Sequence, residues 1–249
     1  MSKIKIDSNL NYKRKDNKII KASQRPLKID YDRYVSIKNH LKKMNYDPKI
    51  LYYKSKFNVV DIGFNSLFLK ALKDLNFLLK YINKESSFLK NYVHLNEKNL
   101  IKLYNSKKMK FKNKDLKNNA LIEIPSITNF FMLFSDLKNK SVNRSLIKSL
   151  KRYCKNEEYL FPSISSSHKL FEEKRYWRGP VWINCNWIIY QGLKNKDKKF
   201  AEIIRKNTIK LVEKKKFREY YSCKSGSGMG AKNFSWSAAL YLDFILNRS

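Results

Sequence analysis

Two stretches hold most of the residues that could do chemistry: RYWRGPVWINCNW (residues 175–187) and FREYYSCKSGSGMG (residues 217–230). The first holds three of the four tryptophans, and aromatic faces with arginine and asparagine donors beside them are typical of carbohydrate sites. The second places Glu219 among aromatic residues, where burial disfavours the charged carboxylate unless Arg218 or water stabilises it. Half of the six glycines lie in residues 225–230, which predicts a tight turn or a close approach of the backbone.

Each of these features also has a purely structural interpretation. Trp182 and Trp187 have the spacing of core residues, and Glu219 has many lysines with which to form an ordinary ion pair. Trp177 and Arg178 fit that interpretation poorly, since an exposed loop gains little from either. A phosphate-binding loop is disfavoured, because the glycines lack both its spacing and a preceding strand.

Helical periodicity predicts the elements that must position these residues. Apolar residues at i, i+3 and i+4 predict a long helix over residues 61–83. The same pattern predicts further helices over residues 34–44, 88–104, 129–137, 142–153, 181–193, 200–213 and 235–246. Pro180 is expected to open the 181–193 helix. The best strand candidate is residues 120–126, and the lysine-rich residues 107–119 are expected to be a solvated connection and an internal boundary.

The totals describe a chain that can bury a core. It has 249 residues, 43% hydrophobic and 14% aromatic, which argues against disorder over most of its length. No apolar run approaches the roughly 20 residues of a membrane span, and the first residues lack a secretory signal. Cys154, Cys185 and Cys223 form no CxxC pair, so we expect free thiols in a cytoplasmic protein and no metal site.

The net charge of +33 is large, but the kind and distribution of the basic residues argue only weakly for nucleic-acid binding. Only ten of the 54 basic residues are arginine, and the lysines are spread along the whole chain. A nucleic-acid-binding protein usually gathers its cations on one face and uses arginine forks. We therefore expect nonspecific contact with nucleic acid, and keep a basic helical nucleic-acid-binding protein as the alternative function.

Four ordered motifs provide a more specific indication. They lie in residues 12–34, 57–75, 176–193 (YWRGPVWINCNWIIYQGL) and 217–240 (FREYYSCKSGSGMGAKNFSWSAAL). Together they resemble glycoside hydrolase family 63 and its mannosylglycerate-hydrolase-like enzymes. The resemblance implies an (α/α)6 barrel, which agrees with the all-α class that periodicity predicts. It also implies hydrolysis of an α-glycosidic bond with inversion and without a cofactor, since two carboxylates and water suffice.

The resemblance implies roles for particular residues. Glu219 corresponds to the general base that activates water. Arg25 and Tyr31 correspond to contacts with an acidic aglycone such as glycerate, for which a bidentate arginine is well suited. The sugar contacts would be Tyr176, Trp177, Gly179 and Trp182. Trp236 would line the sugar subsite or belong to the core.

One part of the family pattern is missing. The general acid, an aspartate in a GxDxSP segment, precedes the region that matches residues 12–34, and Asp7 lacks the flanking residues of that segment. Residues 1–249 are therefore expected to form a single incomplete barrel domain, its C-terminal helices. The chain would either complete its site with a separately encoded N-terminal half or by self-association, or be a truncated and inactive glycosidase, or be a binding module. Ser222 and Cys223 replace the family's Asp-Pro, which predicts a looser turn beside Glu219.

Overall fold

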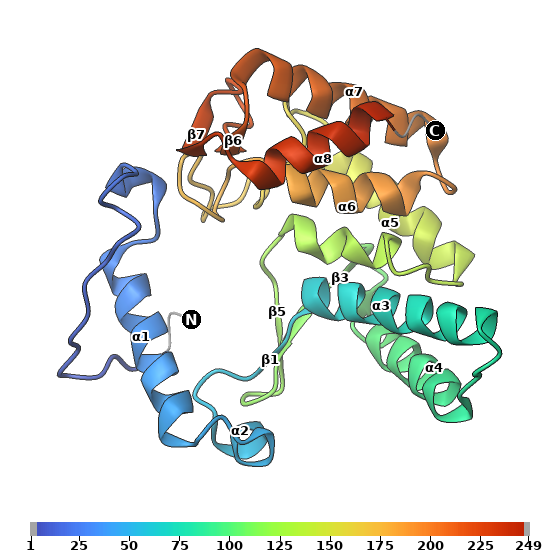
Figure 1. Cartoon of the computed structure of the whole chain (residues 1–249), viewed down its shortest axis with the longest axis horizontal. Helices are drawn as coiled ribbons and strands as arrows, with labels where there is room; N and C mark the ends of the chain where they lie inside the picture. Colours follow the sequence, from blue (N-terminus) through green and yellow to red (C-terminus); the bar gives the residue numbers. More distant parts are fainter. Residues whose placement is uncertain (1–3, 247–249) are drawn as a thin grey trace.

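The computed structural model describes residues 4–246 and is mostly helical (Figure 1). Its α-helices are α1 (Lys28–Lys43), α2 (Pro48–Lys54), α3 (Ile62–Tyr81), α4 (Ser87–Ile101), α5 (Lys140–Tyr153), α6 (Ile183–Leu193), α7 (Lys198–Lys215) and α8 (Ser235–Leu246). Two 3₁₀ helices, η1 (Ala22–Gln24) and η2 (Ile127–Leu133), complete the helical part. The all-α prediction is confirmed.

The strands are short and antiparallel. One sheet has the order β1 (Val59–Val60), β4 (Asn113–Asp115), β5 (Ala120–Ile122). A second pairs β2 (Tyr104–Asn105) with β3 (Lys110–Phe111), and a third pairs β6 (Arg218–Tyr221) with β7 (Gly228–Lys232). The expected strand over residues 120–126 is thus present as the shorter β5.

Side-chain caps explain where the main helices begin. Asp61 accepts from the Phe64 N–H at 2.7 Å and starts α3, while Asp197 accepts from Phe200 N–H at 3.0 Å and starts α7. Each cap satisfies a backbone donor that the first helical turn leaves without a partner. Pro48 lies in the first turn of α2, a short helix that periodicity did not predict.

Two helix expectations are corrected. The helix expected over residues 129–137 is the 3₁₀ helix η2, whose N-terminus Ser126 and Asn129 cap reciprocally. α6 begins at Ile183, not near Pro180, because Val181 exchanges both backbone hydrogen bonds with Tyr221.

The lysine-rich residues 107–119 are not a simple solvated connection. They contain β3 and β4, and the side chain of Phe111 is fully buried against η2 and its neighbours. The Lys112 side chain is only 5% exposed and pairs with Glu123. The strand pairing of β4 with both β1 and β5 ties this region into the fold.

The main hydrophobic core is centred on α6. It is covered by η2, α7 and α8, and α3 packs on the other side of η2 with α4 beside it (Figure 1). We call residues 181–246, which carry α6, α7, the β6–β7 hairpin and α8, the wall. Many of its side chains are almost fully buried, among them Ile189, Tyr190, Leu193, Ile204, Leu211 and Phe244.

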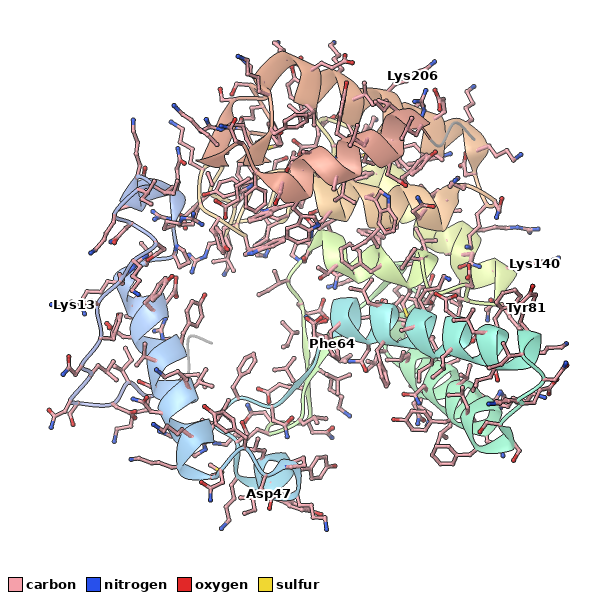
Figure 2. All side chains as sticks on the ribbon, in the orientation of Figure 1. Lys13, Asp47, Phe64, Tyr81, Lys140 and Lys206 are labelled. Atoms are coloured by element: carbon pink, nitrogen blue, oxygen red, sulfur yellow. The ribbon has the colours of Figure 1, made fainter. Side chains whose placement is uncertain are left out.

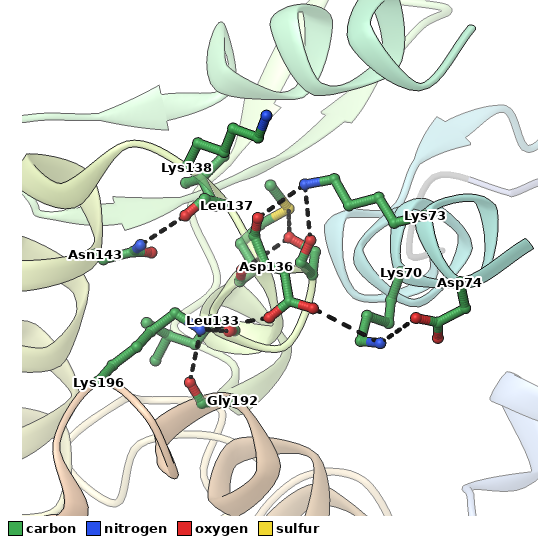
Figure 3. Close-up of polar contacts among 12 residues, drawn as sticks. Lys70, Lys73, Asp74, Leu133, Asp136, Leu137, Lys138, Asn143, Gly192 and Lys196 are labelled. Carbon is green, nitrogen blue, oxygen red and sulfur yellow. Dashed lines mark hydrogen bonds and ion pairs between the residues drawn. The ribbon is translucent and has the colours of Figure 1, made fainter. Parts of the chain in front are cut away.

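Lysines join α3 to the segment after η2. Lys73 of α3 donates to the backbone carbonyls of Ser135 (3.0 Å) and Asp136 (2.9 Å), and Lys70 pairs with the Asp136 carboxylate at 3.7 Å (Figure 3). Lys196 reaches the same carboxylate from the wall. These lysines satisfy carbonyl groups at an element junction, so part of the large positive charge has a structural role.

The N-terminal region, residues 4–54, stands beside the rest of the molecule, and we call it the arm (Figure 1). Its internal contacts are polar or aromatic: the rings of Tyr12 and Tyr31 stack, and Tyr12 donates to Asp32 at 2.7 Å. Within residues 4–54 the buried residues are Asp30 and Ser36, and no apolar side chain of this segment is buried.

Candidate active site

The β6–β7 hairpin holds the carboxylate of Glu219. The residue is 7% exposed, and its Oε2 accepts from the Ala231 N–H at 2.9 Å. Gly230 lies directly against it with φ +67°, and a Cβ at this position would overlap Oε2. The close backbone approach that the glycine-rich stretch predicts is therefore confirmed, and its reason is the contact with Glu219.

The cation that stabilises Glu219 comes from the arm. Arg25 Nη1 donates to Oε1 and Nη2 to Oε2, both at 2.9 Å, in a bidentate pair. The expected neighbour, Arg218, instead turns its guanidinium to the Gly230 carbonyl at 3.3 Å. The partner is neither Arg218 nor a lysine, because folding brings together residues separated by 194 positions.

The hydrogen bonds leave the two carboxylate oxygens unequal. Oε2 accepts from Arg25 and from Ala231 N–H, which fills the usual capacity of one oxygen. Oε1 accepts from Arg25 alone among the contacts of the described residues. Oε1 therefore retains a lone pair that can take a proton from water.

Trp177 presents an aromatic face supported from behind. Its ring stacks on Trp182 at 4.0 Å with an interplanar angle of 3°, and Trp182 leans on Tyr220. Trp177 is 39% exposed and Trp182 is 3% exposed. Tyr176 packs edge-on against both tryptophans, and its backbone carbonyl accepts from Trp182 Nε1 at 3.0 Å.

The remaining tryptophans and Gly179 have different surroundings. Trp187 packs against the core and donates Nε1 to Asp243 at 2.6 Å, as the structural interpretation expected. Gly179 is buried, and a Cβ there would clash with the backbone of Glu172, so its backbone serves packing. Trp236 is 46% exposed, which excludes a core position in this structure.

A cavity of about 370 Å³ connects the arm to the Trp177 region. Its lining residues are Asp16, Arg25, Pro26, Tyr31, Tyr34, Arg175, Tyr176, Trp177 and Arg178. Arg14 stacks over the Tyr31 ring with its guanidinium carbon 3.9 Å from the centroid, and pairs with Asp16 at 2.7 Å. The hydrogen bonds from Arg14 hold the pKa of Asp16 below its usual value, against the opposing effect of burial. Burial raises the pKa of Tyr31 and Tyr176, so both stay neutral at pH 7.

Two arginines of the RYWRGP stretch (residues 175–180) fasten the arm. Arg175 Nη1 donates to the Arg25 carbonyl at 2.9 Å, and Arg178 reaches Asp30 of α1 at 3.1 Å. Glu172 accepts from both arginines. Asp30 and Glu172 could not be picked out from the sequence, since neither belongs to a motif with an evident chemical role. Asp7 lies elsewhere in the arm and pairs with Lys56.

The turn after Glu219, where Ser222 and Cys223 replace Asp-Pro, is held by hydrogen bonds of a side chain. The Ser222 hydroxyl accepts from the N–H groups of Lys224 (3.2 Å) and Ser225 (3.0 Å), and donates to Glu173. A serine that bonds to N–H groups two and three residues ahead forms an ordinary turn. The looser turn stays a prediction, and these hydrogen bonds are contacts that the motif comparison did not include.

The cysteines and the other potential metal ligands form no second candidate site among the described residues. The three cysteines are free and buried, as expected, and burial raises the pKa of Cys154 to about 11. Among residues 4–246, His, Cys, Asp and Glu side chains form no group of three that could hold a metal ion. No helix in the described part of the chain is long and apolar enough to cross a membrane.

Known proteins match this chain over nearly its whole length. The model of the mannosylglycerate hydrolase MGH1-like glycoside hydrolase domain matches residues 4–237. Mannosylglycerate hydrolase from Thermus thermophilus is 33% identical over 245 residues, which are 97% of this chain and 59% of that protein. Glucosylglycerate hydrolase from Mycolicibacterium hassiacum is 26% identical over 94% of this chain and 55% of its own length.

Solved structures agree. The GH63 mannosylglycerate hydrolase from Thermus thermophilus, in complex with Tris and D-glycerate, has a TM-score of 0.94 and 32% identity. The match covers 99% of this chain and 60% of that one. Neutral trehalase from Saccharomyces cerevisiae, 17% identical with a TM-score of 0.57, shares the fold alone. This chain thus spans between about half and three fifths of the length of its relatives.

Proposed function

The chain belongs to the mannosylglycerate hydrolase MGH1-like glycoside hydrolases, and we propose that it forms the base-bearing side of an inverting glycosidase site. Glu219 is the base. The single observation that carries the proposal is the environment of its carboxylate: Oε2 is saturated by Arg25 and Ala231, while Oε1 can accept a proton from water.

Inversion needs a second carboxyl group, an acid that protonates the leaving oxygen from the opposite side of the bond. Among the residues that line the cavity Asp16 is the one carboxylate, and its bidentate pairing with Arg14 keeps it ionised. An ionised carboxylate cannot donate a proton. We therefore propose that the acid comes from outside the described residues.

The substrate is a small α-glycoside with an acidic aglycone, of the glucosylglycerate or mannosylglycerate type. The sugar lies against Trp177 and Tyr176, with Trp182 supporting Trp177 from behind. The aglycone carboxylate contacts Arg25 and Tyr31, which line the same cavity. Gly179 acts indirectly by allowing the tight packing behind Trp177. Trp236 lines none of this cavity, and we assign it to a surface that a further part of the site covers.

Residues 1–249 act as one incomplete barrel domain that pairs with further helices. The apolar stripe of α3 and the neighbouring part of α4 supports this, because several large side chains stay exposed there (Figure 2). Along one face of α3, Phe64 is 68% exposed, Leu75 47% and Leu78 57%, and Phe88 of α4 is 75% exposed. Contiguous apolar surface of this kind marks a docking site in a folded protein. An N-terminal half-barrel, or a second copy of this chain, is the partner that would cover it.

The experiment that tests this proposal supplies the proposed N-terminal part of the barrel from a relative. The N-terminal portion of the Thermus thermophilus relative that lies outside the match is produced separately and mixed with this chain, and mannosylglycerate and glucosylglycerate are offered to each alone and to the mixture. Sugar release by the mixture, with the opposite anomer appearing first by NMR, is expected.

Glu219→Gln should then lower turnover by about 10²–10⁴-fold, the usual contribution of general base catalysis. Glu158→Gln, which removes an exposed carboxylate outside the site, is the matched control. Undiminished turnover by the Glu219→Gln mixture would refute the assignment of the base. No release by any mixture of folded parts would favour an inactive glycosidase or binding module.

A further inference from the structure

Arg25 is held in a state that does not satisfy all its donors. Both Nη groups bind Glu219, yet its Nε is buried and has no hydrogen-bond partner among the described residues. A buried donor without a partner is costly and rare in folded proteins. The guanidinium is thus in a position from which a small shift toward another acceptor would be favourable.

The cavity beside Arg25 offers a place for that acceptor, and its other arginines are less able to provide the cation. Arg175 is bound to the backbone carbonyls of the arm and to Glu172. Arg178 bridges Glu172 and Asp30. Moving either would detach the arm. Among the described residues Arg25 has one hydrogen-bonded side-chain partner, and that partner, Glu219, keeps the Ala231 N–H if the arginine leaves.

We propose that Arg25 is exchanged between two carboxylates: it binds Glu219 in the empty site and turns to the carboxylate of an acidic aglycone when substrate enters. This inference rests on the proposed function and adds a specificity-determining step to it. While Arg25 holds Glu219, the positive charge disfavours transfer of a proton to Oε1. When the aglycone takes Arg25, the base is released. An anionic aglycone therefore favours the catalytic step as well as binding.

Exchange makes a prediction that a fixed Arg25–Glu219 pair does not. If the ligand must compete with Glu219 for Arg25, removing the charge of Glu219 strengthens ligand binding. D-glycerate is the probe, and its binding to the isolated chain is followed by tryptophan fluorescence, since the exposed Trp177 lines the same cavity, and by calorimetry.

The expected result is that Glu219→Gln and Glu219→Ala bind D-glycerate about ten- to a hundredfold more tightly than the unaltered chain, the range of a hydrogen-bonded charge pair. Arg25→Gln should abolish binding. Glu158→Gln and Lys174→Gln, which change one exposed charge each, should stay within about twofold. Glycerol, the uncharged analogue, should not bind.

The possible results distinguish failure of the exchange from failure of the proposed function. Unchanged or weaker D-glycerate binding in both folded Glu219 variants, with circular dichroism as the check on folding, would overturn the exchange, as would binding that survives Arg25→Gln. Failure of the proposed function looks different: the binding pattern would appear as expected, but no completed mixture would hydrolyse a glycoside. Hydrolysis without tighter binding in the Glu219 variants would leave the glycosidase and remove the exchange.

Discussion

The wall and the arm contribute opposite sides of one site, and different forces hold them. The wall is built on a continuous apolar core, in which Ile189 and Tyr190 of α6 and Phe244 of α8 are fully buried. The arm, in contrast, buries no apolar side chain within residues 4–54. Its contacts with the wall and the preceding loop run through hydrogen bonds and ion pairs of Gln24, Arg25 and Asp30.

This difference separates two halves of the site. The wall's half is prepared, because its core holds it in place without ligand, and the arm's half is conditional, because its position depends on charged contacts. Burial of apolar area fixes Glu219 and Trp182 whether or not ligand is present, since hydrophobic stabilisation is insensitive to ligand charge. The arm is held instead by ion pairs of Arg25 and Arg178, both of which line the cavity, and the pairs of Arg178 are partly exposed and individually weak. Position of the arm and occupancy of the site are therefore coupled.

The largest effect should come from the wall. Phe244→Ala removes a fully buried ring from between α8 and α6, where it packs on Tyr190 at 5.2 Å between centroids. We expect the free energy of unfolding to fall by about 3–5 kcal/mol, measured by urea denaturation. Leu242→Ala, on the same helix but 52% exposed, should change it by less than about 1 kcal/mol. Similar losses from both variants would contradict the core described for the wall.

A smaller and more local effect should come from the arm's anchor. Arg178→Gln removes the ion pairs with Asp30 and Glu172. Hydrogen–deuterium exchange of α1 amides should become about tenfold faster or more, because the undocked arm opens more often, while α6 amides stay protected. Lys174→Gln, an exposed charge in the same loop, is the control. Equal acceleration in α1 and α6 would mean that the arm and wall unfold as one unit.

The wall was also the easier half to predict from sequence. The 3.6-residue periodicity gave α7 and α8 nearly to the residue, because apolar burial writes a regular pattern into the chain. It missed the start of α6, where Val181 pairs with a strand 40 residues away, and it made η2 an ordinary helix. Those features depend on partners that are distant in sequence.

The site, like the fold, could be predicted from the sequence only in part. Motif resemblance placed Glu219 beside a glycine loop, and the contact of Gly230 with its carboxylate explains that loop. Resemblance could also name Arg25, but no spacing could reveal that its guanidinium binds Glu219. Ion pairs carry no periodicity, so Asp30 and Glu172 were invisible until the arm was seen against the wall.

The smallest of the expected effects is that of acid, which should loosen the arm at a higher pH than the wall. Burial alone would raise the pKa of Glu172, but the hydrogen bonds from Arg175 and Arg178 outweigh it, and its pKa lies below the usual value. The pKa of Asp16, within the arm, is lowered chiefly by its hydrogen bonds with Arg14. A carboxyl group whose pKa is lower in the folded state stabilises that state above its unfolded pKa, about 4, and loses the contribution as the pH falls through the folded value. The arm should therefore loosen below about pH 4.

The wall has acidic groups of the same kind, since hydrogen bonds also lower the pKa of Asp197 and Glu202. Its buried core does not titrate, however, so losing these contacts leaves the wall folded where the arm has already detached. Exchange measured between pH 6 and pH 3, corrected for the intrinsic rate, should show α1 losing protection at a higher pH than α6. In Glu172→Gln the α1 amides should be partly deprotected at pH 6 and change less with acid. Loss of protection in α1 and α6 at one common pH would show that the arm draws on the wall's core, and that the division between a conditional and a prepared half is wrong.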